Sequence, residues 1–69
     1  MNEVIVEQTE EVIPVDLLLL SDPSEEVINE YIDESVKFIA TLDTKIIGAL
    51  LLLKTRPGTM EIMNISVYK

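Results

Sequence analysis

The nine residues from Met60 to Tyr68, Met-Glu-Ile-Met-Asn-Ile-Ser-Val-Tyr, constrain the fold more than any other stretch. They are rich in β-branched and long apolar residues, which favour strands. They contain no Gly or Pro, and the turn signal Arg56-Pro57-Gly58-Thr59 directly precedes them. We therefore predict a strand. Strict alternation of side chains would give it two faces, one with Glu61, Met63, Ile65 and Val67 and the other with Ile62, Asn64, Ser66 and Tyr68.

On this prediction Glu61 is the only carboxylate on an otherwise apolar strand face. A carboxylate at the edge of an apolar face is easily desolvated, and loss of water favours its neutral form. A general base that works near neutral pH needs this situation. Glu61 is therefore a candidate catalytic residue. The alternative is a solvated residue at the start of a strand, and a bulge would move the side chain to the other face.

Other parts of the sequence predict three further strands and two helices. The first helix, over residues 14–20, begins near Pro14 and contains four consecutive leucines, at least three of which we expect in the core. The second, over residues 23–34, is amphipathic and places Tyr31 in the core, with Asp22 as its expected N-cap. The predicted strands cover residues 3–7, 36–43 and 46–54.

The element order predicts an α+β fold. Short connections make the last three strands an antiparallel meander, and the helices cover a face of the sheet. The strand over residues 46–54 is apolar on both faces, so we expect it to be central and covered on both sides. Gly48 interrupts this strand, which indicates a bulge or the close approach of another backbone.

Length and composition exclude several classes of protein. Sixty-nine residues form one domain at most, and the absence of Cys and His excludes disulfides, thiolate nucleophiles and the commonest metal ligands. The longest apolar run, Ala49 to Leu53, is far shorter than a membrane span, and the first residues do not resemble a signal peptide. We therefore expect a cytoplasmic protein without a metal.

The net charge of −8 is unevenly distributed along the chain. Residues 1–34 carry eleven acidic residues and no Lys or Arg, which gives −11, and residues 35–69 carry two acidic and five basic residues, which gives +3. An acidic surface argues against nucleic-acid and anionic-membrane partners. It would attract a cationic substrate such as an amine, and the alternative is a surface that serves solubility.

The run Glu61-Ile62-Met63-Asn64-Ile65-Ser66-Val67 resembles the fourth strand of the GNAT superfamily of N-acetyltransferases. The preceding strand, Gly-containing strand and tight turn agree with that resemblance, which covers nearly the whole chain but only the first half of the family's domain. It implies transfer of the acetyl group from acetyl-coenzyme A (acetyl-CoA) to an amine. On this basis we identify residues 1–69 as a single partial GNAT-like domain.

The resemblance also implies site residues. Glu61 matches the position at which some members, including the histone acetyltransferases, hold a general base. The backbone N–H groups near Ile65 and Val67 match those that bond the acetyl carbonyl and the pantetheine arm. Pantetheine contains amides, so such contacts resemble a peptide that adds to a sheet edge. A donor aimed at the thioester oxygen would also stabilise the developing oxyanion.

The family's pyrophosphate-binding loop, of pattern Gln/Arg-x-x-Gly-x-Gly/Ala, follows this strand, and the sequence ends at Lys69 before it. We therefore expect a truncated fragment that is inactive by itself. Residues Met60–Tyr68 would form an exposed apolar edge strand, and such edges pair with other chains. This predicts a homodimer through that strand. The alternative function is a small acidic interaction module without catalysis.

Overall fold

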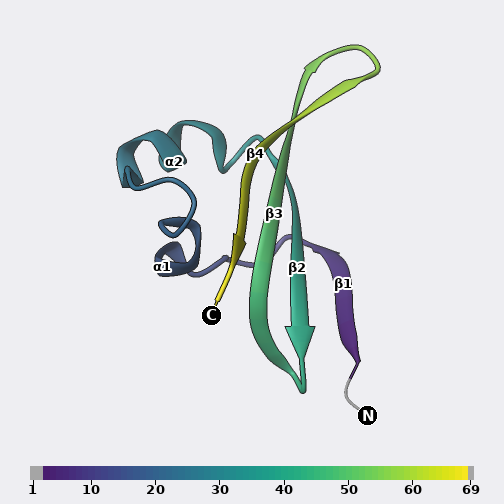
Figure 1. The fold of residues 1–69 in the computed structure, drawn as a ribbon. Coiled ribbons are helices and arrows are strands. Elements are labelled where there is room, and N and C mark those ends of the chain that lie inside the picture. The colour runs from purple at the N-terminus through teal and green to yellow at the C-terminus, as the bar shows by residue number, and fades with distance from the viewer. Residues whose placement is uncertain (1–2, 69) are drawn as a thin grey trace.

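The computed structural model describes residues 3–68 and shows one four-stranded antiparallel sheet with two short helices beside it (Figure 1). The strand order is β1-β2-β3-β4. The predicted α+β class and antiparallel meander are therefore confirmed. The elements are β1 (Val4–Thr9), α1 (Val15–Leu18), α2 (Glu25–Tyr31), β2 (Val36–Leu42), β3 (Lys45–Arg56) and β4 (Thr59–Val67).

The two hairpin turns fit the residues that form them. Gly58 has a φ of 78°, the left-handed conformation that the third position of a type II turn requires. Asp43 and Thr44 also have positive φ values, of 50° and 67°. Two consecutive left-handed residues are the signature of a type I′ hairpin, whose twist matches that of the flanking strands. A β-branched residue such as Thr44 is strained in that conformation.

The second helix begins later than the sequence indicated. Its N-cap is Ser24, whose side-chain oxygen accepts a hydrogen bond from the Val27 N–H at 3.3 Å. The prediction of Asp22 as N-cap was wrong because Asp22 bonds elsewhere. One oxygen of its carboxylate accepts from the Ser24 N–H at 3.2 Å, and the other accepts from the Tyr31 hydroxyl at 3.2 Å.

The hydrophobic core lies between the helices and one face of the sheet. Its members come from the segment before α1, from both helices and from β3: Ile13, Leu17, Leu18, Ile28, Tyr31, Ala49 and Leu51. Leu19 packs against this cluster and Leu20 is exposed, so three of the four consecutive leucines belong to the core as predicted. Tyr31 is buried, also as predicted.

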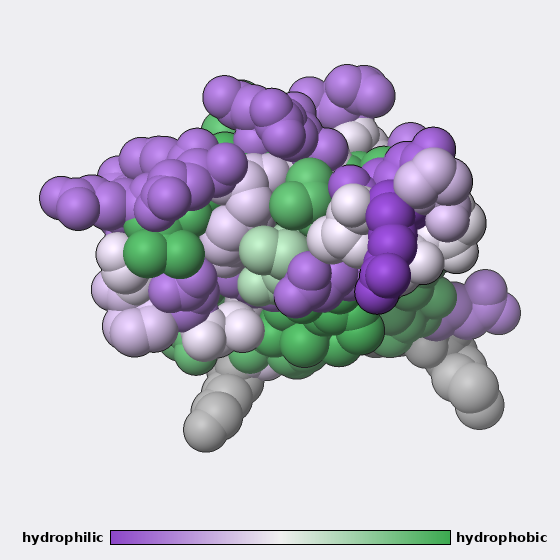
Figure 2. Space-filling model, turned by 90° about the horizontal axis from the view of Figure 1, so that it is seen from above, coloured by the Kyte–Doolittle hydropathy of each residue, from purple (hydrophilic) through white to green (hydrophobic). Residues whose placement is uncertain are grey.

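The opposite face of the sheet has no cover among residues 3–68. Direct strand partners share a face, so Val6, Ala40, Gly48 and Val67 form one row across it, and Phe38, Leu50 and Ile65 form the next. Figure 2 shows apolar residues gathered in a band along one side of the molecule and hydrophilic residues across the other. β3 is central, as expected, but the described residues cover it on one side and not on both.

Two bulges adjust the sheet. Ala40 pairs with Gly48 and Thr41 pairs with Ile46, so Ile47 is the extra residue in β3. In β4, Asn64 pairs with Leu51 and Ile62 with Leu52, which leaves Met63 without a partner. A bulge of this kind shifts the alternation of side chains on either side of it. The bulge in β4 therefore decides which face each of its residues occupies.

None of the helices within residues 3–68 has the length and apolar character that a membrane span requires.

Candidate functional site

β4 has a free edge within the described residues, because its only strand neighbour is β3. The Tyr68 N–H donates to the Ile47 carbonyl oxygen at 2.8 Å. A Cβ placed on Gly48 would lie 3.0 Å from the Ser66 carbonyl oxygen, so that carbonyl also faces β3. Because backbone groups alternate in direction along an antiparallel strand, the N–H and C=O groups of Ile65 and Val67 point to the free edge.

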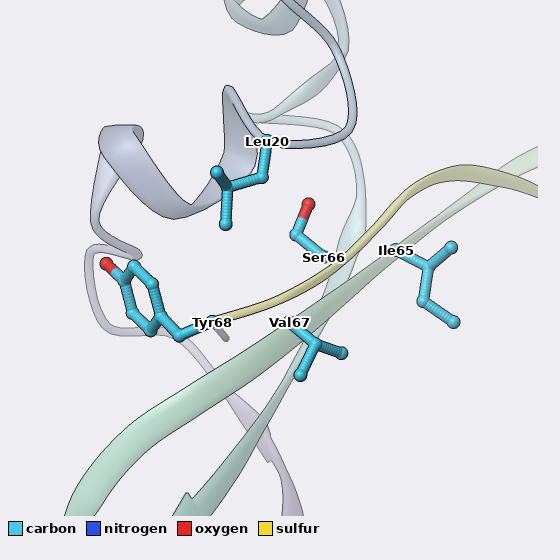
Figure 3. Close-up of a pocket in the computed structure, with 5 residues that line it drawn as sticks. All are labelled: Leu20, Ile65, Ser66, Val67 and Tyr68. Carbon is cyan, nitrogen blue, oxygen red and sulfur yellow. The ribbon is translucent and has the colours of Figure 1, made fainter.

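A hollow of about 400 Å³ lies beside this edge and is lined by Leu20, Ile65, Ser66, Val67 and Tyr68. Figure 3 shows the Ser66 side chain pointing toward Leu20, which follows α1, while the Ile65 and Val67 side chains point away from it. The backbone of β4 therefore forms one wall of the hollow. Both sequence-predicted cofactor-binding residues, Ile65 and Val67, line it, and Leu20 forms the opposite wall.

A buried chain of polar groups holds that wall in place. The Asn64 side-chain amide donates to the Leu18 carbonyl oxygen at 3.0 Å and to the Tyr31 hydroxyl oxygen at 3.1 Å. The Ser66 hydroxyl donates to the amide oxygen of Asn64. Tyr31 in turn donates to Asp22. These bonds join the end of α1, the segment before α2, the last residue of α2 and β4, so they hold Leu20 and the strand backbone at a fixed separation.

The two tyrosines that contact this region have perturbed acidities. The pKa of Tyr31 is raised, mainly by burial and also by the Asp22 carboxylate. The hydrogen bond from Asn64 lowers the pKa and offsets part of this increase. The pKa of Tyr68 is also raised, by loss of water and by the Asp16 carboxylate, which accepts from its hydroxyl at 2.9 Å. Both tyrosines therefore stay protonated at neutral pH and act as hydrogen-bond donors that anchor acidic residues to the edge of the site.

Glu61 lies outside the hollow. It pairs with Leu53, on the strand face that Asn64 and Ser66 also occupy, and its side chain is exposed. The predicted face, shared with Ile65 and Val67, was wrong because the bulge at Met63 shifts the alternation. Glu61 and Ser66 are five positions apart, which corresponds to roughly 15 Å along a strand. The structure therefore does not bring Glu61 together with the two predicted cofactor-binding residues.

Sequence reasoning missed the roles of Leu20 and Asn64. Leu20 ends a leucine run in which its neighbours are core residues, so nothing in the pattern distinguished it. Asn64 did carry a signal, because a strong hydrogen-bonding side chain in the middle of an apolar strand needs partners. The sequence could not show which groups satisfy it, since Leu18 and Tyr31 are 46 and 33 residues away.

Within residues 3–68 no group of three or more acidic side chains converges on a position that could hold a metal ion. The strand edge offers outward-facing hydrogen-bonding groups next to a small hollow with one apolar wall. Such an edge suits a ligand with amide or carbonyl groups along an extended chain.

No protein-family model matches this chain. It is 46% identical over 52 residues to an uncharacterized N-acetyltransferase, YvbK, of Bacillus subtilis, a match that spans 75% of this chain and 34% of the relative.

Three solved structures share the fold. An IAA acetyltransferase from Bacillus cereus matches with a TM-score of 0.88 and 46% identity over 97% of this chain. A GNAT family acetyltransferase from Elizabethkingia anophelis with acetyl-CoA bound has a TM-score of 0.87 and 35% identity over 96% of this chain. An acetyltransferase of Bacillus subtilis in complex with CoA has a TM-score of 0.84 and 40% identity over 94%.

The fold, the open β4 edge and these relatives agree on one class, the GNAT acetyltransferases, and the chain belongs to this family. It spans about 45% of the length of the solved relatives, with values of 45%, 44% and 44% for the three structures.

Proposed function

We propose that this chain provides the acetyl-CoA-contacting strand of an N-acetyltransferase, which transfers the acetyl group to a primary amine. The observation that carries the proposal is the free edge of β4, where the N–H groups of Ile65 and Val67 point outward beside the hollow. Two of the solved relatives hold acetyl-CoA or CoA, which supports the same ligand here.

The pantetheine arm would lie along β4 as an added strand. Its amides would accept from and donate to the outward-facing groups of Ile65 and Val67. One of the two N–H groups would face the thioester carbonyl, and a fixed donor there stabilises the negative charge that develops on that oxygen during attack by the amine. The hollow between Leu20 and the strand would exclude water from the reacting carbonyl, which strengthens that interaction.

A cationic acceptor is consistent with the net charge of −8, which attracts amines to the surface. The amine must lose a proton before it attacks, and Glu61 is our candidate general base. Glu61 lies on the same strand face as Ser66, whose side chain points to the hollow. Since it lies roughly 15 Å along the strand from Ser66, it would take the proton from the amine through a chain of ordered water molecules that leads along β4 from the hollow.

We further propose that the chain alone does not turn over. Its 69 residues contain no segment with the pattern Gln/Arg-x-x-Gly-x-Gly/Ala that the family uses to hold the pyrophosphate. Backbone N–H groups at a helix start supply much of the affinity for such a group. Release of CoA thiol during incubation with acetyl-CoA and a polyamine should therefore equal the rate without protein. A faster release that Glu61→Gln abolishes would overturn this part of the proposal.

Calorimetric titration with acetyl-CoA tests the strand contacts themselves. Val67→Pro removes the outward N–H and leaves the bonds to β3 intact, because Pro is tolerated where the N–H of an edge strand faces solvent. Val67→Ala removes side-chain atoms but keeps the N–H and is the matched control. We expect weak binding that Val67→Pro lowers by about tenfold, the value of one charge-free hydrogen bond in a water-poor site. Equal binding by both variants, or none at millimolar acetyl-CoA, would contradict the proposal.

A further inference from the structure

Exposed apolar side chains flank the free edge of β4 on both sides of the sheet. Three large apolar side chains around Ser66 are strongly exposed: Leu20 at 60%, Ile65 at 62% and Val67 at 62%. Leu20 lies on the helix side of the sheet, and Ile65 and Val67 lie on the open side. The free backbone groups of the edge are therefore flanked by apolar surface on both sides, as in the interior of a sheet.

The part of the edge from Asn64 to Tyr68 also lacks the features that normally prevent strand pairing. Exposed edges are protected by Lys or Pro on the strand, by inward-pointing charges or by bulges. β4 contains no Lys and no Pro, and its one charged residue, Glu61, lies beyond the bulge at Met63. The segment from Asn64 to Tyr68 is thus a short, regular and uncharged edge.

From these observations we propose that β4 pairs with β4 of a second copy of this chain, antiparallel and about a two-fold axis at Ser66. In that register Ile65 of one copy lies opposite Val67 of the other, and the reverse. Both residues have their N–H and C=O groups directed outward, so each such pair exchanges two hydrogen bonds. The two Leu20 side chains then lie near the axis on the helix side, and the Ile65 and Val67 side chains pack on the open side.

A second copy satisfies this edge because the two outward-facing residues flank Ser66 symmetrically and bond each other across the two-fold axis. The paired surface is small, since stable dimers bury about 1,200 Å² or more and this contact involves five strand residues and one leucine on each side. Each copy also carries a net charge of −8. The association is therefore weak, and salt strengthens it by screening the repulsion between the copies.

This inference rests in part on the proposed function, because pairing and acetyl-CoA require the same N–H groups of Ile65 and Val67. The two are mutually exclusive, and acetyl-CoA dissociates the dimer.

Sedimentation velocity of the full chain, from micromolar to millimolar protein, tests the pairing without any cofactor. We expect a concentration-dependent dimer whose dissociation constant rises at least about tenfold in Val67→Pro, which loses half of the bonds, and less than about threefold in Val67→Ala. A monomer at every concentration, or a dimer unchanged by Val67→Pro, would overturn the pairing.

If circular dichroism shows that Val67→Pro does not fold, sedimentation velocity of Leu20→Asp tests the pairing instead. Leu20→Asp places two carboxylates near the two-fold axis and should abolish the dimer. Leu20→Asn is the control, because Asn has the shape of Asp without its charge, and it should weaken the dimer less. Equal dimerisation of the two Leu20 variants overturns the proposal.

Acetyl-CoA is added last. If the dimer persists while calorimetry shows that acetyl-CoA is bound, the two do not use the same edge of β4, and the claim that they are mutually exclusive is wrong. Dimer without any acetyl-CoA binding leaves the pairing in place and removes the proposed function.

Discussion

Replacement of Asn64 by Leu tests whether the buried polar chain holds the site together. Asn64 is 2% exposed and bonds the Leu18 carbonyl, the Tyr31 hydroxyl and the Ser66 hydroxyl. Leu has the same branching and the same number of side-chain heavy atoms but is larger, so the substitution removes the hydrogen bonds without leaving a cavity. The Leu18 carbonyl still accepts from the Asp22 N–H at 3.1 Å, and Tyr31 still donates to Asp22. The Ser66 hydroxyl, in contrast, is left buried without a partner.

The expected cost follows from these contacts. Loss of two hydrogen bonds whose partners keep other contacts costs about 1 kcal/mol each, and an orphaned buried hydroxyl costs about 1–3 kcal/mol. Additional apolar burial by Leu offsets part of this, which leaves about 3 kcal/mol. A chain of this length has a total stability of about 3–10 kcal/mol. The variant should therefore lose a large fraction of its stability, with a fall in melting temperature of about 12–24 °C.

Urea denaturation followed by far-ultraviolet circular dichroism measures this cost, and a double-mutant cycle with Ser66→Ala identifies its origin. Ser66→Ala removes the hydroxyl that Asn64→Leu leaves without a partner. The double variant should therefore be less destabilised than the sum of the two single variants, by about 1 kcal/mol or more. An Asn64→Leu cost below about 0.5 kcal/mol, or strictly additive effects, would refute the reasoning.

Three further predictions concern the turns, the sheet and pH. Thr44→Gly should raise the free energy of unfolding by about 0.5–1 kcal/mol in urea denaturation, because Gly relieves the left-handed strain at φ 67° but adds unfolded-state entropy; a loss would contradict it. Gly48→Ala should cost about 1–3 kcal/mol, since its Cβ would lie 3.0 Å from the Ser66 carbonyl oxygen; an unchanged denaturation midpoint would contradict it. Tyr31 has a raised pKa in the folded state, so the unfolded chain ionises first above the ordinary value of 10.0 and the free energy of unfolding should fall there with rising pH, by up to about 1.4 kcal/mol per pH unit. Tyr31→Phe should flatten this fall in denaturation curves between neutral and strongly alkaline pH, and an equally steep fall in the variant would assign it to other groups.

The sequence predicted the elements because their local signals agree with the fold. The turn residues Pro57 and Gly58 and the alternation in the strands are local features, and each strand lies within two residues of its predicted bounds. Ile65 and Val67 were placed at the edge through the resemblance, and the structure shows their backbone groups directed outward. The N-cap of α2 was wrong because Asp22 is recruited by Tyr31, a contact across nine residues that no capping rule includes.

The position of Glu61 could not be predicted for a different reason. Its face depends on the bulge at Met63, which shifts the alternation by one residue. Nothing in the local composition marks that bulge, since no Gly or Asn lies at Met63 itself. The bulge is a property of how β4 is paired with β3, so only the register of the two strands reveals it.

The central claim is that the outward N–H groups of Ile65 and Val67 contact acetyl-CoA. Amide chemical shifts from a ¹H–¹⁵N correlation spectrum, recorded as acetyl-CoA is added, test it most directly. We predict the largest changes at Ile65 and Val67, a smaller change at Leu20 across the hollow, and little change at the β1 edge on the other side of the sheet. Changes centred on β1, or none at millimolar acetyl-CoA, would contradict it.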